Sequence, residues 1–232
     1  MAPEDQAEAE QKQQERWDAK TAEAYFHHSL TDSKLVWDAI AADLLPFSKG
    51  RAIADLGCAD GCFGHRLEAA SLANVDPFPP ADAPHPIIAM DGVAYLETCD
   101  AKSLDLIFAT FAVHLMDRQR LNAEMERVLG PGGRAIFFSV SKNCTFFGSP
   151  EYNELFFSMG FEKSGSKDGE KPARTLTIKI PQTHEQLHAF VTNRTWSNLK
   201  VMPEETIEKL ASLVPKDLQS VDVSIDVFEF VH

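Results

Sequence analysis

Residues 54–64 read ADLGCADGCFG. An acid, Asp55, comes before four small residues, namely Gly57, Ala59, Gly61 and Gly64. Small residues in such a loop allow a tight turn and a close approach of the backbone to a ligand. Three interpretations are open from the stretch alone: a cradle for a nucleotide-like ligand, a metal loop, or a strand-to-helix turn that holds nothing.

The composition restricts the class of protein. The chain has 232 residues, of which 44% are hydrophobic and 25% charged, and its formal net charge is −13. The length suits one α/β domain with a modest addition. The acidic balance disfavours nucleic-acid binding, because like charges repel the phosphate backbone.

Targeting signals are not evident in the sequence. No apolar run approaches the roughly 18–20 residues that a membrane helix needs, and the polar N-terminus lacks the apolar core of a signal peptide. Four cysteines in a chain of this size need no disulfide framework. We therefore expect a cytoplasmic protein with no membrane partner.

Apolar strands alternate with helical segments through most of the chain. Strands are expected at 51–55, 72–76, 86–90, 104–109, 134–140, 174–180 and 221–231. Helices are expected between them, at 62–70, 92–99 and 117–129. Near-continuous apolar strands separated by helices predict an α/β fold with a buried, mostly parallel sheet and helices on both faces.

The two ends of the chain differ from this pattern. Residues 1–14 are expected to be a disordered or frayed tail, and residues 15–45 a helical cap that Pro46 stops. Between the last two strands, Thr183 with Gln186 forms a capping-box pattern, and a further helix starts near Pro203. We therefore expect a small helical insertion at 181–215 within a single domain that spans 15–232.

Two kinds of ligand compete for the glycine loop. Residues 59–64 (A-x-G-x-x-G) lie one substitution from the dinucleotide fingerprint, and Asp76 follows at about the distance that a ribose-binding acid requires. Asp55, however, places negative charge where a pyrophosphate needs donors, and Asp91 adds another carboxylate after the third strand. A site lined by acids suits a cationic ligand with ribose hydroxyls and an amino acid ammonium group.

The sequence resembles the class I S-adenosylmethionine (SAM)-dependent methyltransferases, and in particular small-molecule members of the type 11 kind. The segments that carry the resemblance are IADLGCADGCFG, NVDPF, AMDG, LDLIFATFAVHLMD and VLGPGGRAIFFS, which occur in family order across residues 51–140. The resemblance implies a Rossmann-like seven-stranded sheet with SAM as cofactor, bound by the core 51–140. It also implies that the cap and the insertion at 181–215 act as a lid.

Site residues follow from the resemblance, position by position. Residues implied to bind the cofactor are Tyr25, Asp55, Gly57, Cys58, Ala59, Gly61, Asp76, Pro77, Phe78, Asp91, Gly92 and Thr110. The loop from Asp55 to Gly61 is expected at the methionyl part, Asp76 at the ribose, and Phe78 beside the adenine. Ala59 departs from the common glycine, and we expect it to be tolerated provided that φ is negative there.

Residues implied to meet the acceptor are His28, His114 and Trp196. His114 is the candidate catalytic base, because the histidine pKa lies near the operating pH. The alternative for His114 is a packing role, and Trp196 is as well explained by core packing. Cys58 and Cys62 lack a second pair of ligands for zinc, so we expect packing thiols and no metal.

The expected reaction is direct SN2 displacement of the SAM methyl group by a small-molecule acceptor, whose carboxylate, hydroxyl, thiol or amine nature stays open. We expect a monomer or homodimer. The alternatives are a protein or RNA methyltransferase that acts with a partner, and a catalytically silent SAM-binding scaffold.

Overall fold

The computed structural model describes residues 34–141, 171–193, 199 and 202–232. The predicted tail at 1–14 and the first part of the predicted cap therefore lie outside the described residues. The rest of the expected architecture can be compared with the structure element by element.

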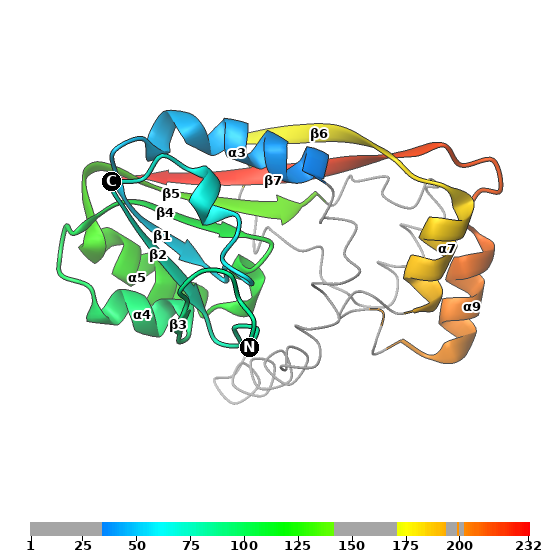
Figure 1. The fold of residues 1–232 in the computed structure, drawn as a ribbon, viewed down its shortest axis with the longest axis horizontal. Helices are drawn as coiled ribbons and strands as arrows, with labels where there is room; N and C mark the ends of the chain where they lie inside the picture. Colours follow the sequence, from blue (N-terminus) through cyan, green and yellow to red (C-terminus); the bar gives the residue numbers. More distant parts are fainter. Residues whose placement is uncertain (1–33, 142–170, 194–198, 200–201) are drawn as a thin grey trace.

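The described strands form one seven-stranded sheet in the order β3-β2-β1-β4-β5-β7-β6 (Figure 1). Their bounds are β1 Ala52–Leu56, β2 Ser71–Asp76, β3 Ile88–Ala89, β4 Leu104–Thr110, β5 Leu129–Val140, β6 Arg174–Pro181 and β7 Ser220–Val231. Strands β1 to β5 run parallel to one another, whereas β7 runs antiparallel to both β5 and β6. The predicted α/β fold with a mostly parallel seven-stranded sheet is confirmed.

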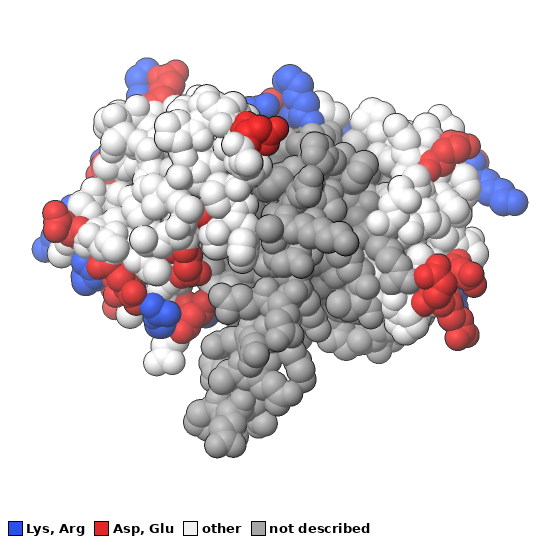
Figure 2. Space-filling model, turned by 60° about the horizontal axis from the view of Figure 1, so that its bottom comes forward, with Lys and Arg blue, Asp and Glu red and all other residues white. Residues whose placement is uncertain are grey.

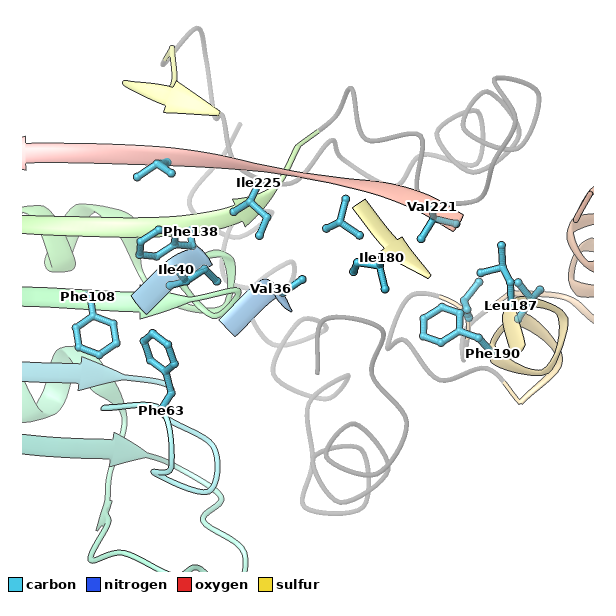
Figure 3. Close-up of a cluster of buried hydrophobic side chains, with 14 of the residues drawn as sticks. Val36, Ile40, Phe63, Phe108, Phe138, Ile180, Leu187, Phe190, Val221 and Ile225 are labelled. Atoms are coloured by element: carbon cyan, nitrogen blue, oxygen red, sulfur yellow. The ribbon is translucent and has the colours of Figure 1, made fainter. Parts of the chain in front are cut away.

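Helices cover both faces of this sheet (Figure 1). Helix α3 (Lys34–Ser48) lies on one face, and α4 (Gly92–Thr98) and α5 (Arg118–Val128) lie on the other. The inner face of α3 packs on Phe63, Phe108 and Phe138 to form one apolar cluster (Figure 3). Aliphatic side chains of α4 and α5 form a second cluster against the opposite face.

Helix α3 continues past Pro46, so the prediction that this residue stops the helix is wrong by two residues. A proline costs one backbone hydrogen bond, and the loss is small in a last turn. Here Phe47 packs against the core and the Ser48 hydroxyl donates to the Leu45 carbonyl oxygen at 3.3 Å. These contacts hold the final turn in helical form.

The expected helix at 62–70 is also wrong, because only the 3₁₀ turn η2 (Gly64–Arg66) forms there. A Cβ at Gly64 would lie 2.9 Å from the Leu72 side chain and 3.0 Å from the Asn74 Oδ1 atom. The loop is therefore pressed against β2, and Leu67 already has extended backbone. Close packing of Gly64 against β2 therefore prevents the helix that the spacing of apolar residues at 62–70 predicted.

The insertion between the last two strands has the predicted place. Helices α7 (His184–Thr192) and α9 (Glu204–Ser212) lie at the tip of a ribbon that β6 and β7 form beyond the end of β5 (Figure 1). The predicted capping box starts α7, since the Gln186 backbone N–H donates to Thr183 and the Thr183 N–H to the Gln186 side chain. Figure 3 shows how Ile180 and Val221 continue the apolar cluster along the ribbon.

Acidic and basic side chains are interspersed along the described surface in the view of Figure 2. Glutamates at the start of α9 (Glu204 and Glu205) contribute to the acidic side chains of the insertion. In the described part of the chain, no helix has the length and apolar character that crossing a membrane requires.

Candidate functional site

The candidate site lies at the carboxyl ends of the parallel strands. Strand order places β1 between β2 and β4, and the direction of winding reverses between β1 and β4. Ligands of open α/β sheets bind at such a switch point. Asp55, Asp76 and Thr110 stand at or next to the last positions of β1, β2 and β4, so the sheet brings the three predicted residues to one edge.

The glycine loop follows β1 directly and has an unusual backbone. The backbone N–H groups of Gly57 and Cys58 donate to the Val75 carbonyl oxygen at 2.8 and 3.1 Å. Gly57, Ala59 and Gly61 have φ angles of 73°, 59° and 75°. The condition of a negative φ at Ala59 is therefore not met, because this alanine adopts the left-handed conformation that favours glycine.

Two predicted cofactor glycines also serve internal packing. A Cβ at Gly57 would lie 2.4 Å from the Ala112 Cβ, and a Cβ at Gly92 would lie 3.2 Å from the Met116 Cε. Both missing side chains point toward the segment that follows β4. Only the backbone of these two residues is available to a ligand, and their glycine identity is explained by close approach of the loops.

Asp55 is the most unusual charged group of the site. Its side chain is 1% exposed, and neither carboxyl oxygen has a hydrogen-bond partner among the described residues. Burial, followed by the negative charges of Asp76 and Asp60, raises its pKa well above the ordinary carboxyl value. A buried carboxyl group without a partner fits a site that receives a cationic or N–H donor group from a ligand.

Asp76 is better satisfied than Asp55. Its carboxylate accepts hydrogen bonds from the backbone N–H groups of Ala59, at 3.0 Å, and Phe78, at 2.8 Å. Burial raises its pKa, and the two hydrogen bonds oppose this shift. Asp76 therefore ties the glycine loop to the loop after β2, and a carboxylate retains acceptor capacity for ribose hydroxyls.

The other predicted cofactor residues have mixed surroundings. Asp91 is exposed and caps α4, because its Oδ1 atom accepts from the N–H groups of Val93 and Ala94 at 3.0 Å. Pro77 is exposed, while Phe78 and Thr110 are half-buried. A structural role at the N-terminus of α4 thus accounts for Asp91 without a ligand.

The two cysteines of the loop differ. Cys58 is buried, and burial raises the pKa of its thiol, so the predicted packing role agrees with its position. Cys62 is exposed, so the same prediction is wrong for this residue. Among the described residues, no three side chains of the metal-binding kinds form a group that could hold an ion.

His114 lies in the 3₁₀ turn η3 (Val113–Leu115), shortly after β4. The side chain is exposed, and desolvation by the surrounding protein lowers its pKa to about 4. The neutral form of the ring therefore predominates at pH 7. The expected pKa near neutrality is therefore replaced by one on the acidic side, which leaves a neutral but weak base.

An aromatic group beside this turn was not predicted. Phe111 follows β4 with a φ of 59°, and its N–H donates to the Phe138 carbonyl oxygen at 2.8 Å. Its ring lies 6.2 Å from that of Trp37, which in turn lies 5.0 Å from Phe63. A large side chain in the left-handed region is strained, and such strain is concentrated at functional sites.

Asn74 is a second residue that the sequence reasoning missed. It is buried in β2, its amide nitrogen donates to the Pro86 carbonyl oxygen at 3.3 Å, and its side chain lies beside Gly61 and Gly64. A polar residue inside the apolar run LANVD was the available signal. The predicted residues Tyr25, His28 and Trp196 lie outside the described part of the chain.

Comparisons with known proteins agree with this arrangement. Residues 54–137 match the family profile described as "Methyltransferase domain". A search of curated proteins found no match.

Several solved structures share the fold. A protein described as a type II methyltransferase from Anaeromyxobacter dehalogenans is 19% identical, with a TM-score of 0.54 over 83% of this chain and 95% of its own. One described as a methyltransferase of an antibiotic biosynthesis pathway from Anabaena variabilis is 17% identical, with a TM-score of 0.52 over 83% and 96%. The YcgJ protein from Bacillus subtilis is 12% identical, with a TM-score of 0.50 over 84% and 97%.

Proposed function

We propose that the chain is a class I SAM-dependent methyltransferase and that it transfers the methyl group of SAM to a small-molecule acceptor. One observation carries the proposal. Residues 54–137, which match the family profile, include the buried carboxyl group of Asp55, which has no hydrogen-bond partner among the described residues. That group stands at the switch point of the sheet, where this fold class binds its ligands.

The residues at this edge fit the parts of the cofactor. Asp55 offers buried carboxyl oxygens to the methionyl end, and the loop through Gly57, Ala59 and Gly61 offers backbone groups there. Asp76 offers acceptor capacity to the ribose hydroxyls. The Phe78 N–H donates to the Asp76 carboxylate, and the Phe78 ring is the candidate to pack against the adenine ring.

SAM supplies a methyl group that its sulfonium already activates, so that a nucleophile takes it by direct SN2 displacement. The protein therefore has to align the acceptor and exclude water. Thr110, Phe111 and His114 leave β4 at the edge where the carboxylates of β1 and β2 end. They are the described residues best placed to meet the acceptor.

His114 is proposed to accept a proton from an acceptor that has to lose one. The neutral ring at pH 7 is in the correct protonation state for this task. A carboxylate or thiolate acceptor needs no base, and His114 would then serve to position it. The aromatic rings of Phe111 and Trp37 favour an acceptor with an apolar part.

A small molecule is favoured as acceptor for a physical reason. The net charge of −13 opposes the approach of RNA, whose phosphates carry the same sign. We also propose that the insertion with α7 and α9 closes the site as a lid, which suits a small acceptor. As expected from the sequence, we propose a cytoplasmic protein that is a monomer or a homodimer.

The first experiment measures cofactor binding by calorimetry with SAM and with its demethylated product S-adenosylhomocysteine (SAH). Binding of both is expected, and binding of neither would refute the function. The second follows SAH release with panels of carboxylic acids, phenols, amines and thiols. Methylation of protein or RNA substrates instead, or of none, would point to the partner-dependent enzyme or to the silent scaffold.

A further inference from the structure

Helix α7 begins with the sequence HEQLH, residues 184–188, in the insertion between β6 and β7. We propose that His184 and His188 together bind a divalent transition-metal ion, such as Zn²⁺, through their imidazole nitrogens. The pair lies outside the residues proposed to hold SAM, so this site does not depend on the methyltransferase function.

The spacing of the two histidines is that of a helical metal-binding pair. In a helix, residues i and i+4 lie on one face, and the pattern H-E-x-x-H on a helix places two zinc ligands together. The structure meets this condition, since the whole pattern lies within α7 and the capping box at Thr183 fixes where the helix starts. The expectation of no metal rests on Cys58 and Cys62 and does not take this stretch into account.

The distance between the two rings fits a shared ion. The ring centres of His184 and His188 lie 5.6 Å apart, and the ring planes are tilted by 38°. Two imidazoles that bind one Zn²⁺ at about 2.1 Å in a tetrahedral arrangement have ring centres roughly 5 Å apart. Both side chains are half-buried, so an ion from solvent has access to them.

A backbone contact sets the tautomer of His184. Its Nδ1 atom lies 3.2 Å from the Pro215 carbonyl oxygen, which can only accept, so Nδ1 carries the proton and Nε2 keeps the lone pair that a metal needs. A carbonyl oxygen that accepts the other ring N–H is the usual outer-shell partner of a metal-binding histidine. The ring of His188 makes no hydrogen bond in the described part of the chain, so its nitrogens are also available.

The charges near the pair are compatible with a cation. The positive end of the helix dipole disfavours a cation at the first turn, and Glu185 in that turn opposes this effect. The net charge of −13 also attracts cations to the surface. Imidazole ligands favour Zn²⁺, Ni²⁺ and Cu²⁺, whereas Mg²⁺ prefers oxygen ligands.

Two protein ligands suit a binding site and not a peptidase. Catalytic zinc sites use three protein ligands, and among the described residues no third side chain of a metal-binding kind joins His184 and His188. Water completes the coordination of the ion. The two rings have this spacing only in the folded helix, so the bound ion stabilises the first turn of α7 and with it the insertion.

The test uses the full-length protein without a histidine tag. Calorimetry should show binding of one Zn²⁺ by the pair, and no binding of Mg²⁺ at the same concentration. His188→Gln should weaken this Zn²⁺ binding at least about tenfold, because even the loss of an outer-shell partner costs about 10–100-fold. Zn²⁺ should also raise the Tm of the wild type more than that of the variant.

His65→Gln is the matched control. The rings of His65 and His85 are stacked, with centres 3.7 Å apart and planes tilted by only 20°. A metal lies in the plane of each ring that binds it, so two nearly parallel rings do not share one ion. This variant should bind Zn²⁺ as the wild type does.

The electron paramagnetic resonance spectrum of Cu²⁺ on the unchanged protein gives a second readout, in which splitting by two imidazole nitrogens is expected. Absence of Zn²⁺ binding, equal affinity in the wild type and His188→Gln, or equal weakening in His65→Gln would overturn the proposal. If His188→Gln does not fold, the Cu²⁺ spectrum decides, because oxygen ligands alone or a single nitrogen would exclude the pair. None of these results bears on the binding of SAM.

Discussion

Ala59 in the glycine loop has a strained backbone conformation. Its φ of 59° lies in the region where a Cβ meets the neighbouring carbonyl oxygen. The conformation persists because the Ala59 N–H donates to Asp76 and because Gly57 and Gly61 turn the chain in the same sense on either side. The loop geometry therefore comes from its surroundings and not from the alanine.

Replacing Ala59 by glycine should stabilise the protein. Release of the left-handed strain outweighs the entropy that glycine adds to the unfolded chain, for a net gain of about 0.5–1 kcal/mol in the free energy of unfolding. Urea denaturation measures the change. The control is Ala94→Gly within α4, where the same substitution should cost about 1 kcal/mol. A loss of stability in Ala59→Gly would show that the left-handed conformation of Ala59 is not strained.

Gly57 is expected to be the least replaceable glycine of the loop. In Gly57→Ala the new Cβ meets the Ala112 Cβ at 2.4 Å, in addition to the strain of a φ of 73°. We expect a loss of at least about 2 kcal/mol. Gly132→Ala separates the two effects, because its φ is 75° and no atom lies within 4 Å of the new Cβ. Its loss should be only about 1 kcal/mol, and equal losses would exclude a role for the clash.

His114 should titrate on the acidic side of an ordinary histidine. Because its folded pKa lies near 4, the neutral ring is favoured in the folded state, and folding loses this contribution as pH falls from about 6.5 toward 4. NMR titration of the ring, assigned with His114→Gln, measures the midpoint. The variant should bind SAH normally and slow methyl transfer. A midpoint at or above 6.5, or full turnover in the variant, would remove His114 from the proposed mechanism.

At the scale of elements, helix α3 is attached to the sheet by a group of charges. Arg174 on β6 donates to both carboxylate oxygens of Asp43 on α3, at 2.8 and 2.5 Å, and to Glu229 on β7 at 2.9 Å. Glu229 also pairs with Arg134 on β5, whose guanidinium lies over the Phe47 ring. One arginine thus joins the helix that covers the sheet to the two strands that close it.

Arg174→Met should lower the free energy of unfolding by about 1–2 kcal/mol, because two half-buried carboxylates lose a charged donor. Lys34→Met is the control, since the pair of Lys34 with Asp38 is exposed and should contribute less than about 0.5 kcal/mol. Urea denaturation is suitable because, unlike guanidinium, urea does not screen charges. Equal losses in the free energy of unfolding would show that the ion pairs of Arg174 stabilise the protein no more than the exposed pair of Lys34 does.

Elements that rest on local signals were predictable, and those that rest on tertiary packing were not. Thr183 with Gln186 starts α7 as predicted, because a capping box is complete within four residues. The helix expected at 62–70 fails because Leu72 and Asn74, on the next strand, fill the space beside Gly64. Strand β3 shrinks to Ile88–Ala89 at the sheet edge, where Pro86 has no N–H to donate.

At the scale of the whole molecule, the order of carboxylates along the chain predicted which edge of the sheet carries the candidate site. Asp55 and Asp76 each end a strand, and parallel strands end at one edge, so their proximity followed from the topology. The missing partners of Asp55, the left-handed Phe111 and the acidic pKa of His114 were not accessible from the sequence. Each depends on what other strands place beside the residue.

The molecule divides into the sheet with the proposed cofactor residues and the insertion between β6 and β7. The ribbon ends with Pro181 opposite Ser220, and the Gln182 N–H donates to the Gln219 carbonyl oxygen at 3.1 Å. A two-residue Asn-Gly turn in place of 183–218 would close these strands as a hairpin. Since the proposed cofactor residues among those described lie on β1, β2, β4 and their loops, the shortened chain should fold and bind SAH within a few-fold of the full chain.

Methyl transfer, by contrast, should be lost, because the insertion is proposed to close over the acceptor and exclude water. The deletion uncovers Ile180 and Val221, so both are changed to threonine, which keeps strand preference without an apolar patch. The full-length chain with the same two threonines is the control for stability and activity. Loss of SAH binding in the shortened chain alone would show that the insertion belongs to the cofactor site, whereas full turnover would show that it has no part in closing the acceptor site.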